Sequence, residues 1–329
     1  MKRMRGRSKV KLLYAFNRLV EKWMALVTPL CLLIGVLFPE FIGRGLPFVP
    51  IVFGLISFIG GLNTRFCDIK NVFRRPLPLL MTLGTLHILL PLAACGVGRL
   101  FFSSDPNLIT GMVLEFVVPT AVVSLMWVSI YRGDSPLSLS VVVVDTLLSP
   151  FLIPLSLKLL LGSTVSIDTA DMMRQLLFMI AIPAVVAMLL NELTRGRSKE
   201  YLPSRLAPFS KLALIFVVAC NSSKVAPYIR NLTPKLVAVA LCILLLAASG
   251  YAVGFLIGLL THQKREAVVS LTFGSGMRNI SAGAVLAAAY FPPEVMFPVM
   301  IGTLFQQVLA ATYGVLLKKY YSSKPDTGN

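Results

Sequence analysis

Acidic, histidine and cysteine side chains are scarce in this 329-residue chain. It has 14 aspartates and glutamates against 31 lysines and arginines, with two histidines and five cysteines. The cysteines fall singly along the sequence and show no spacing typical of a metal or redox site. The sequence therefore predicts no metal site and no cofactor, and we interpret the cysteines as small core residues.

Motifs of catalysis and nucleotide binding are also missing. The chain has no His-Glu-x-x-His, no Gly-x-Gly-Asp and no Gly-Lys-Ser/Thr phosphate-binding loop. These absences argue against an enzyme and against an ATP-driven pump. The sequence therefore predicts no catalytic residues. The net charge of +17 does not predict a nucleic-acid partner, because the basic residues lie in short loops between apolar runs.

Long runs of hydrophobic residues are abundant in the sequence. Hydrophobic residues make up 56% of the chain, and the mean hydropathy is +0.81. A helix needs roughly 20 apolar residues to cross a bilayer. The predicted fold class is an all-α polytopic membrane protein in a lipid bilayer. Its ten transmembrane helices are expected at residues 23–39, 46–64, 77–100, 109–131, 137–161, 173–191, 206–227, 236–260, 267–290 and 294–317.

The basic residues give these spans an orientation. If the spans alternate, 23 of the 31 lysines and arginines fall on the side that holds both termini, and six fall on the other side. Cytoplasmic loops carry the excess of positive charge. We therefore predict a protein of the cell (inner) membrane with both termini cytoplasmic, residues 1–22 being a basic arm and 318–329 a tail.

Ten spans divide into two halves of five, and an odd number of spans gives the halves opposite orientations. We therefore predict two inverted repeats. The first covers residues 23–161, a connecting loop with the sixth helix covers 162–205, and the other four helices of the second repeat cover 206–317. No seam of small residues is recognised that would indicate an oligomeric state.

The fourth span of each half contains residues that disrupt a helix. Gly274, Gly276 and Arg278 lie close together in the ninth span. A glycine costs about 1 kcal/mol relative to alanine in an exposed helix, and a central arginine costs about 2.5–3.5 kcal/mol on membrane insertion. Pro119 interrupts the fourth span. Helix breaks at corresponding positions of two repeats indicate a binding site between the repeats.

Few polar side chains lie at membrane depth, and these are the candidate site residues. Arg278 is the leading candidate, because a guanidinium and the N-terminus of a half-helix both attract a carboxylate. The substrate-binding candidates are Arg278, Asn279, Ser281, Ser124, Thr120, Gln306 and Gln307. The ion-coupling candidates are His87, Asp145, Ser138 and Glu115.

Most of these residues also have a structural interpretation. His87 can be a satisfied core histidine, and Glu115 can lie at the headgroup level near the outer end of its span. The two glutamines can join helices by hydrogen bonds. Asp145 can act in coupling or form a buried ion pair with Arg278. The rotation of its helix decides between these two roles.

A set of short motifs follows in order over residues 20–317: Arg75-Pro76, Pro91 in span three, Pro119 with Ser124 and Arg132-Gly133, Ser149-Pro150, and Gly276-Met277-Arg278-Asn279. Together these motifs resemble the bile acid:sodium symporter family, which includes bacterial transporters of pantothenate-like and 2-oxo acids. The resemblance implies ten helices, a panel and a core domain, and unwinding of spans four and nine where they cross.

The positions that hold sodium in coupled members of this family are changed here. The resemblance places one sodium site at Ser124, Leu125, Ser138, Val142 and Gly274, and a second at Gly274, Arg278 and His87. A hard cation needs oxygen ligands and negative charge, which a glycine and an arginine do not supply. Val308 and Leu309 stand where bile-acid binders of the family have a His-Asn pair, so bile acid is not the expected substrate.

We therefore expect a secondary transporter that moves a small or amphipathic organic anion by alternating access, coupled to protons or uncoupled. A sodium-coupled organic-anion or bile-acid symporter is the alternative within this class. The alternative of another class is a receptor or scaffold that kept the fold without transporting. The expected partners are the organic anion, a proton or a sodium ion, and the lipid bilayer.

Overall fold

The computed structural model describes residues 26–27, 29–65, 76–162 and 168–322, and its secondary structure in these ranges is helical. The arm 1–22, the motif residue Arg75 and the tail from 323 onward lie outside the described residues. Within them, seven helical segments are long and apolar enough to cross a membrane, which confirms a multi-pass all-α protein. These segments are Pro39–Gly61, Pro76–Phe101, Ser135–Leu161, Thr169–Leu193, Arg197–Arg230, Pro234–Leu260 and Pro293–Ser322.

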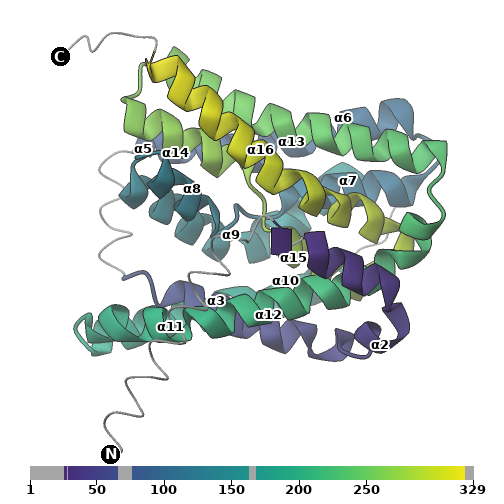
Figure 1. The fold of residues 1–329 in the computed structure, drawn as a ribbon, viewed down its shortest axis with the longest axis horizontal. Coiled ribbons are helices and arrows are strands. Elements are labelled where there is room, and N and C mark those ends of the chain that lie inside the picture. Colours follow the sequence, from purple (N-terminus) through teal and green to yellow (C-terminus); the bar gives the residue numbers. More distant parts are fainter. Residues whose placement is uncertain (1–25, 28, 66–75, 163–167, 323–329) are drawn as a thin grey trace, which may run out of the picture. The chain divides into compact units, whose positions relative to one another are not determined.

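The helices form two compact units, and the first contains the described residues up to 65 and those from 175 to 231. Its elements are α2 (Pro39–Gly43), η1 (Leu46–Phe48), α3 (Val49–Gly61), the π-helical turn η3 (Leu177–Ala181), α11 (Ile182–Leu193) and α12 (Arg197–Arg230). Helix α12 packs along α2 and α3, and α11 packs on α3 (Figure 1). Helix α12 begins before the predicted span start at residue 206, because hydropathy marks only the apolar part of a helix whose hydrogen bonding continues into polar sequence.

The second unit contains the described residues among 76–174 and 232–322, and it holds all of the candidate site residues. In it α13 packs along both α14 and α16, and α7 packs between α6 and α16 (Figure 1). Its elements are α5 (Pro76–Gly84), the π-helical turn η2 (Thr85–Leu89), α6 (Leu90–Phe101), α7 (Pro106–Val117), α8 (Ser124–Ile130), α9 (Ser135–Leu161), α10 (Thr169–Leu176, which crosses into the first unit), α13 (Pro234–Leu260), α14 (Arg265–Gly276), α15 (Ile280–Tyr290), η4 (Pro293–Val295) and α16 (Met296–Ser322).

A seam of small residues joins α13 to α14, which corrects the expectation that the sequence has none. Gly250, Gly254 and Gly258 recur at every fourth position of α13, on one face of the helix. A Cβ on Gly254 would overlap the carbonyl oxygen of Leu271, and a Cβ on Gly250 would lie 3.0 Å from the carbonyl oxygen of Ser275. Small residues at this spacing let two membrane helices approach closely. Here the seam serves packing within the unit.

Replacing Gly254 by alanine is expected to destabilise the protein by about 1–3 kcal/mol, because the added methyl group must displace the backbone of α14. The matched control is Gly96→Ala in α6, where a Cβ would meet nothing within 4 Å. Thermal unfolding in detergent, monitored by size-exclusion chromatography, measures this effect. The melting temperature of Gly254→Ala should be lower than that of the wild type, and that of Gly96→Ala should be unchanged. Equal melting temperatures for the two variants would contradict the close approach of α13 and α14.

The start of α7 is held to the start of α13 by an ion pair. Lys235 Nζ donates to Asp105 Oδ2 at 2.8 Å. This hydrogen bond holds the pKa of the Asp105 carboxyl below its ordinary value. Both side chains are partly exposed, so the pair fixes where the two helices begin and contributes little to stability.

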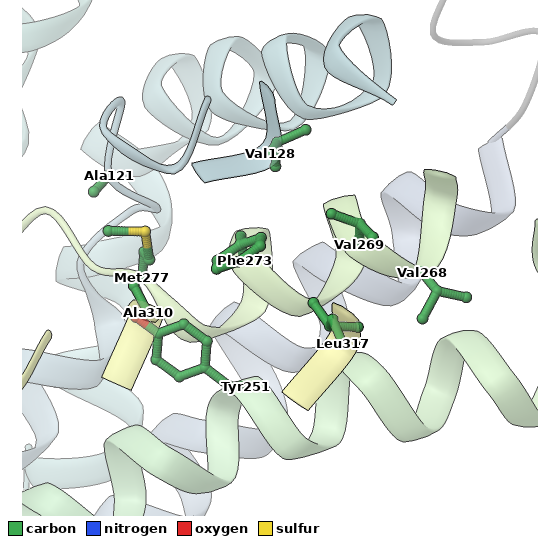
Figure 2. Close-up of a cluster of buried hydrophobic side chains, with 9 residues drawn as sticks. All are labelled: Ala121, Val128, Tyr251, Val268, Val269, Phe273, Met277, Ala310 and Leu317. Atoms are coloured by element: carbon green, nitrogen blue, oxygen red, sulfur yellow. The ribbon is translucent and has the colours of Figure 1, made fainter. Parts of the chain in front are cut away.

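Buried hydrophobic side chains, with the rings of Tyr251 and Phe273 among them, pack around α14 in the second unit (Figure 2). Phe273 is fully buried, its ring centre lies 5.8 Å from that of Tyr131 and 6.0 Å from that of Trp127, and Tyr251 meets it edge-on at 6.3 Å. Offset and edge-on rings stabilise such a core beyond their buried area. The cluster gives the end of α14, which leads into the candidate site, a rigid support.

Candidate functional site at two helix breaks

The two stretches predicted to be the fourth and ninth spans are each interrupted, as the sequence indicated. Helix α7 ends at Val117 and α8 begins at Ser124, with Pro119 between them. Helix α14 ends at Gly276 and α15 begins at Ile280. Proline has no N–H to continue a helix, which explains the first break. The second break falls after the glycines, since Gly274 and Gly276 still belong to the last turn of α14.

The two breaks are hydrogen bonded to each other. The amide of Asn279 donates to the carbonyl oxygen of Pro119 at 2.8 Å. The hydroxyl of Thr120 donates to the carbonyl oxygen of Gly274 at 2.9 Å. Backbone groups freed by a helix break must find partners when they are buried. Each break thus supplies partners for the other, and we refer to this place as the crossing.

Asp145 of α9 bonds to the crossing through one oxygen and to His87 through the other. Its Oδ2 accepts from the amide of Thr120 at 2.7 Å, and its Oδ1 lies 2.6 Å from His87 Nε2. Asp145 is fully buried, and the His87 side chain is 7% exposed. The charge of Asp145 also acts on Arg278. Within the described residues its hydrogen-bond partners are His87 and Thr120 rather than Arg278.

His87 reaches Asp145 from a π-helical turn. Pro91 lies four residues after His87, and a proline ring clashes with the carbonyl group four residues before it in an α-helix. The chain widens here into the π-helical turn η2, which ends at Leu89. Turns of this kind occur often at functional sites. The ring nitrogen Nδ1 of His87 is buried and has no partner in the described part of the chain.

Arg278 lies in the break between α14 and α15 and is 3% exposed. Its Nη1 donates to the carbonyl oxygens of Ser275 at 3.0 Å and Met277 at 3.4 Å. Its guanidinium carbon lies 5.9 Å from the ring centre of Phe116. The other two nitrogens, Nε and Nη2, are buried without a hydrogen-bond partner among the described residues. An arginine at this depth thus has half of its guanidinium unused.

The two glutamines of α16 have different surroundings. Gln306 Oε1 accepts from the backbone amide of Arg278 at 2.8 Å, so Gln306 belongs to the crossing. Gln307 Oε1 accepts from the Trp127 indole at 3.1 Å and therefore serves helix packing beside the aromatic cluster. Asn279 caps α15 by accepting from the amide of Ala282 at 3.3 Å.

The remaining predicted residues are buried. Ser124 and Ser138 are at most 2% exposed, and their hydroxyl groups have no partner in the described ranges; Ser281, on the first turn of α15, is 8% exposed. Glu115, which we expected near the outer end of its span, is 2% exposed and lies two residues before the end of α7. This burial does not favour the alternative interpretation of a side chain at the headgroup level, and the end of α7 at Val117 puts Glu115 beside the break.

Sequence reasoning missed two residues that shape this region. The Tyr251 hydroxyl donates to the carbonyl oxygen of Gln306 at 3.1 Å, and a Cβ on Gly276 would overlap its ring. Gly302 of α16 leaves room for the Glu115 carboxyl group, because a Cβ there would overlap Oε1. Neither residue stands out in the sequence, since one is an aromatic in an apolar run and the other is one of 23 glycines.

Comparison with known proteins indicates the family of this chain. A family model described as the Sodium Bile acid symporter family matches residues 50–232. Uncharacterized protein YbaS of Bacillus subtilis (strain 168) is 43% identical over 297 residues, which cover 90% of this chain and 97% of that protein. Uncharacterized sodium-dependent transporter YocS of the same organism is 23% identical over 291 residues, 88% of each chain. The Hepatic sodium/bile acid cotransporter of Rattus norvegicus is 21% identical over 268 residues, 80% of this chain and 73% of that protein.

Proposed function

Because the chain belongs to the sodium bile acid symporter family and is a multi-pass membrane transporter rather than an enzyme, we propose that it carries a small or amphipathic organic carboxylate across the membrane by alternating access. We further propose that it works as a proton-coupled carrier or a uniporter, without the sodium sites of the coupled members. The substrate-binding residues are Arg278 and its neighbours at the crossing.

The main support for this proposal is that two nitrogens of the Arg278 guanidinium have no hydrogen-bond partner among the described residues. These two nitrogens, Nε and Nη2, lie on one edge of the guanidinium plane. That edge presents two parallel N–H groups, the geometry that receives both oxygens of a carboxylate. A buried cation with two open donors is costly unless a ligand or partner uses them. An organic carboxylate meets the charge and the geometry together.

The sodium-coupled alternative draws on the relatives, of which YocS and the hepatic protein carry sodium in their names. Against it stands the chemistry of this crossing. Arg278 is a fixed positive charge, and Gly274 has no side chain to coordinate an ion. The Asp145 carboxylate is already hydrogen bonded through both of its oxygens. The proposed coupling ion is therefore a proton, with His87, Asp145, Ser138 and Glu115 as the residues considered for it.

The proposed architecture has ten spans in two inverted repeats. The breaks support it, because each falls in the fourth span of its half. The two compact units support a panel built from spans one, two, six and seven and a core built from the other six. The repeat boundaries at 23–161 and 206–317, the link at 162–205, the cytoplasmic termini and the cell (inner) membrane location belong to this proposal.

Transport into proteoliposomes tests the function. Labelled pyruvate, pantothenate and taurocholate would be offered under a sodium gradient, a proton gradient or no gradient. We expect at least one carboxylate to exchange by counterflow without sodium, and we expect an imposed sodium gradient to leave its accumulation unchanged. Uptake that requires sodium would contradict the proposal. Wild-type protein that exchanges no member of the panel would contradict carboxylate transport.

A further inference from the structure

Glu115 is a buried carboxyl group that the hydrogen bonds of the crossing do not use. The residue is 2% exposed, and its Oε2 has no hydrogen-bond partner among the described residues. Its Oε1 lies against Gly302 of α16, where a Cβ would overlap it. A glycine at this position leaves the space that the carboxyl group occupies. The fold therefore holds Glu115 inside the unit although its Oε2 has no hydrogen-bond partner among the described residues.

Arg278 is the charged residue that acts on Glu115. The two side chains interact electrostatically, as Arg278 also does with Asp145. The guanidinium carbon lies 5.9 Å from the ring centre of Phe116, the neighbour of Glu115. They form no ion pair in the part of the chain that the structure describes. The guanidinium keeps two unpartnered nitrogens and the carboxyl group keeps one unpartnered oxygen. A cation and an acid with open hydrogen-bonding capacity thus lie in one buried region.

The other titratable groups on the elements packed against α7 are occupied or remote. Those elements are α6, η2, α9, α15, α16 and η4. Helix α16 has no titratable side chain between residues 296 and 312. His87 and Asp145 are hydrogen bonded to each other. Cys95 and Arg99 both donate to the carbonyl oxygen of Leu160. Lys158, Tyr290 and Glu294 lie near the ends of their elements. This leaves Arg278 as the charge that Glu115 responds to.

We propose that Glu115 is the proton-coupling residue of this transporter and that it alternates with the substrate carboxylate as the counter-ion of Arg278. This inference rests on the proposed function, in which Arg278 binds the carboxylate. An isolated charge in an apolar interior is strongly unfavourable, and a second unpaired carboxylate beside one guanidinium is equally so. With substrate bound, Glu115 therefore carries a proton. Without substrate, Glu115 is ionised and neutralises Arg278.

The proton balance of one transport cycle follows from this exchange. Where the site is open, the substrate carboxylate binds Arg278, and the Glu115 carboxylate takes one proton from water, forming an O–H bond. On the other side the substrate leaves, the O–H bond breaks and the proton returns to water. One proton thus accompanies each monocarboxylate in the same direction. A difference of one pH unit then drives accumulation of up to about tenfold.

Glu115→Gln tests this role, with Glu294→Gln in η4 as the matched control. In proteoliposomes we would measure counterflow at equal pH, accumulation under an inside-alkaline gradient, and substrate-induced pH change with trapped pyranine. The probes are pyruvate, pantothenate and taurocholate. Wild type and Glu294→Gln should show all three signals. Glu115→Gln should still exchange substrate, because exchange moves no net proton. Its accumulation ratio should fall to one and its pH change should disappear.

Two further results separate the possible failures. Proton-driven accumulation by Glu115→Gln would overturn this inference and leave the proposed function standing, whereas a wild type without counterflow would overturn both. If Glu115→Gln does not fold, infrared difference spectra of the wild type decide. Adding the exchanged carboxylate should produce the C=O stretch of a protonated carboxylic acid. A spectrum without that band would overturn the inference.

Discussion

Arg278→Ala is expected to abolish transport. The variant removes the only buried guanidinium of the crossing within the described residues, and with it the two N–H groups proposed to hold the substrate carboxylate. Removing one partner of a buried, hydrogen-bonded charge pair costs about 2–5 kcal/mol. That corresponds to a loss of roughly 30-fold to several thousand-fold in binding. The dissociation constant of the exchanged carboxylate, measured by calorimetry in detergent, gives this loss directly.

Arg278→Lys distinguishes geometry from charge. Lysine keeps the positive charge, but its ammonium group is a point charge and cannot present two parallel N–H groups. We therefore expect this variant to recover only a small part of the lost affinity. The matched control is Arg265→Gln at the start of α14, an exposed residue whose guanidinium lies over the Tyr321 ring. Wild-type affinity in Arg278→Lys would contradict bidentate recognition, and wild-type affinity in Arg278→Ala would contradict the site itself.

The helix breaks and Arg278 could be predicted because their cause is local. A central arginine flanked by glycines, or a proline within an apolar run, conflicts with an unbroken membrane helix wherever the rest of the chain lies. The orientation of the spans stays a prediction, and it too rests on a local property, the charge of each loop. These features need no knowledge of which helices touch.

The partners of the buried polar groups could not be predicted, because they depend on how helices rotate and pack. Asp145 had two open interpretations, and the structure bonds it to His87, 58 residues away. The sequence gives no measure of helix rotation, so neither this pair nor the approach of Gly302 to Glu115 could be derived. The surroundings of Glu115 could not be derived for a related reason, because they are set by the break that follows it in the chain.

Asp145→Ala is expected to be the most destabilising single change at the crossing. The carboxylate satisfies the Thr120 amide and His87 Nε2 at once, so its removal leaves two buried polar groups without their acceptor. Breaking a buried pair in this way costs about 3–5 kcal/mol. The exposed control is Asp171→Ala, whose carboxylate bonds the Tyr290 hydroxyl at the surface and should cost less than about 1 kcal/mol. Chemical unfolding in detergent measures both.

A double-mutant cycle with His87→Ala then shows how the cost of Asp145→Ala is divided. If the His87 bond accounts for part of it, the double variant should be more stable than the sum of the single changes predicts, by about 0.5–3 kcal/mol. Asp145→Asn adds a second comparison, because its amide oxygen can still accept from the Thr120 amide while the charge is lost. A small cost for Asn with a large cost for Ala would mean that Asp145 holds the break in span four mainly as a hydrogen-bond acceptor. Equal costs would mean that the negative charge itself is required. Additive single changes would contradict a direct interaction between His87 and Asp145.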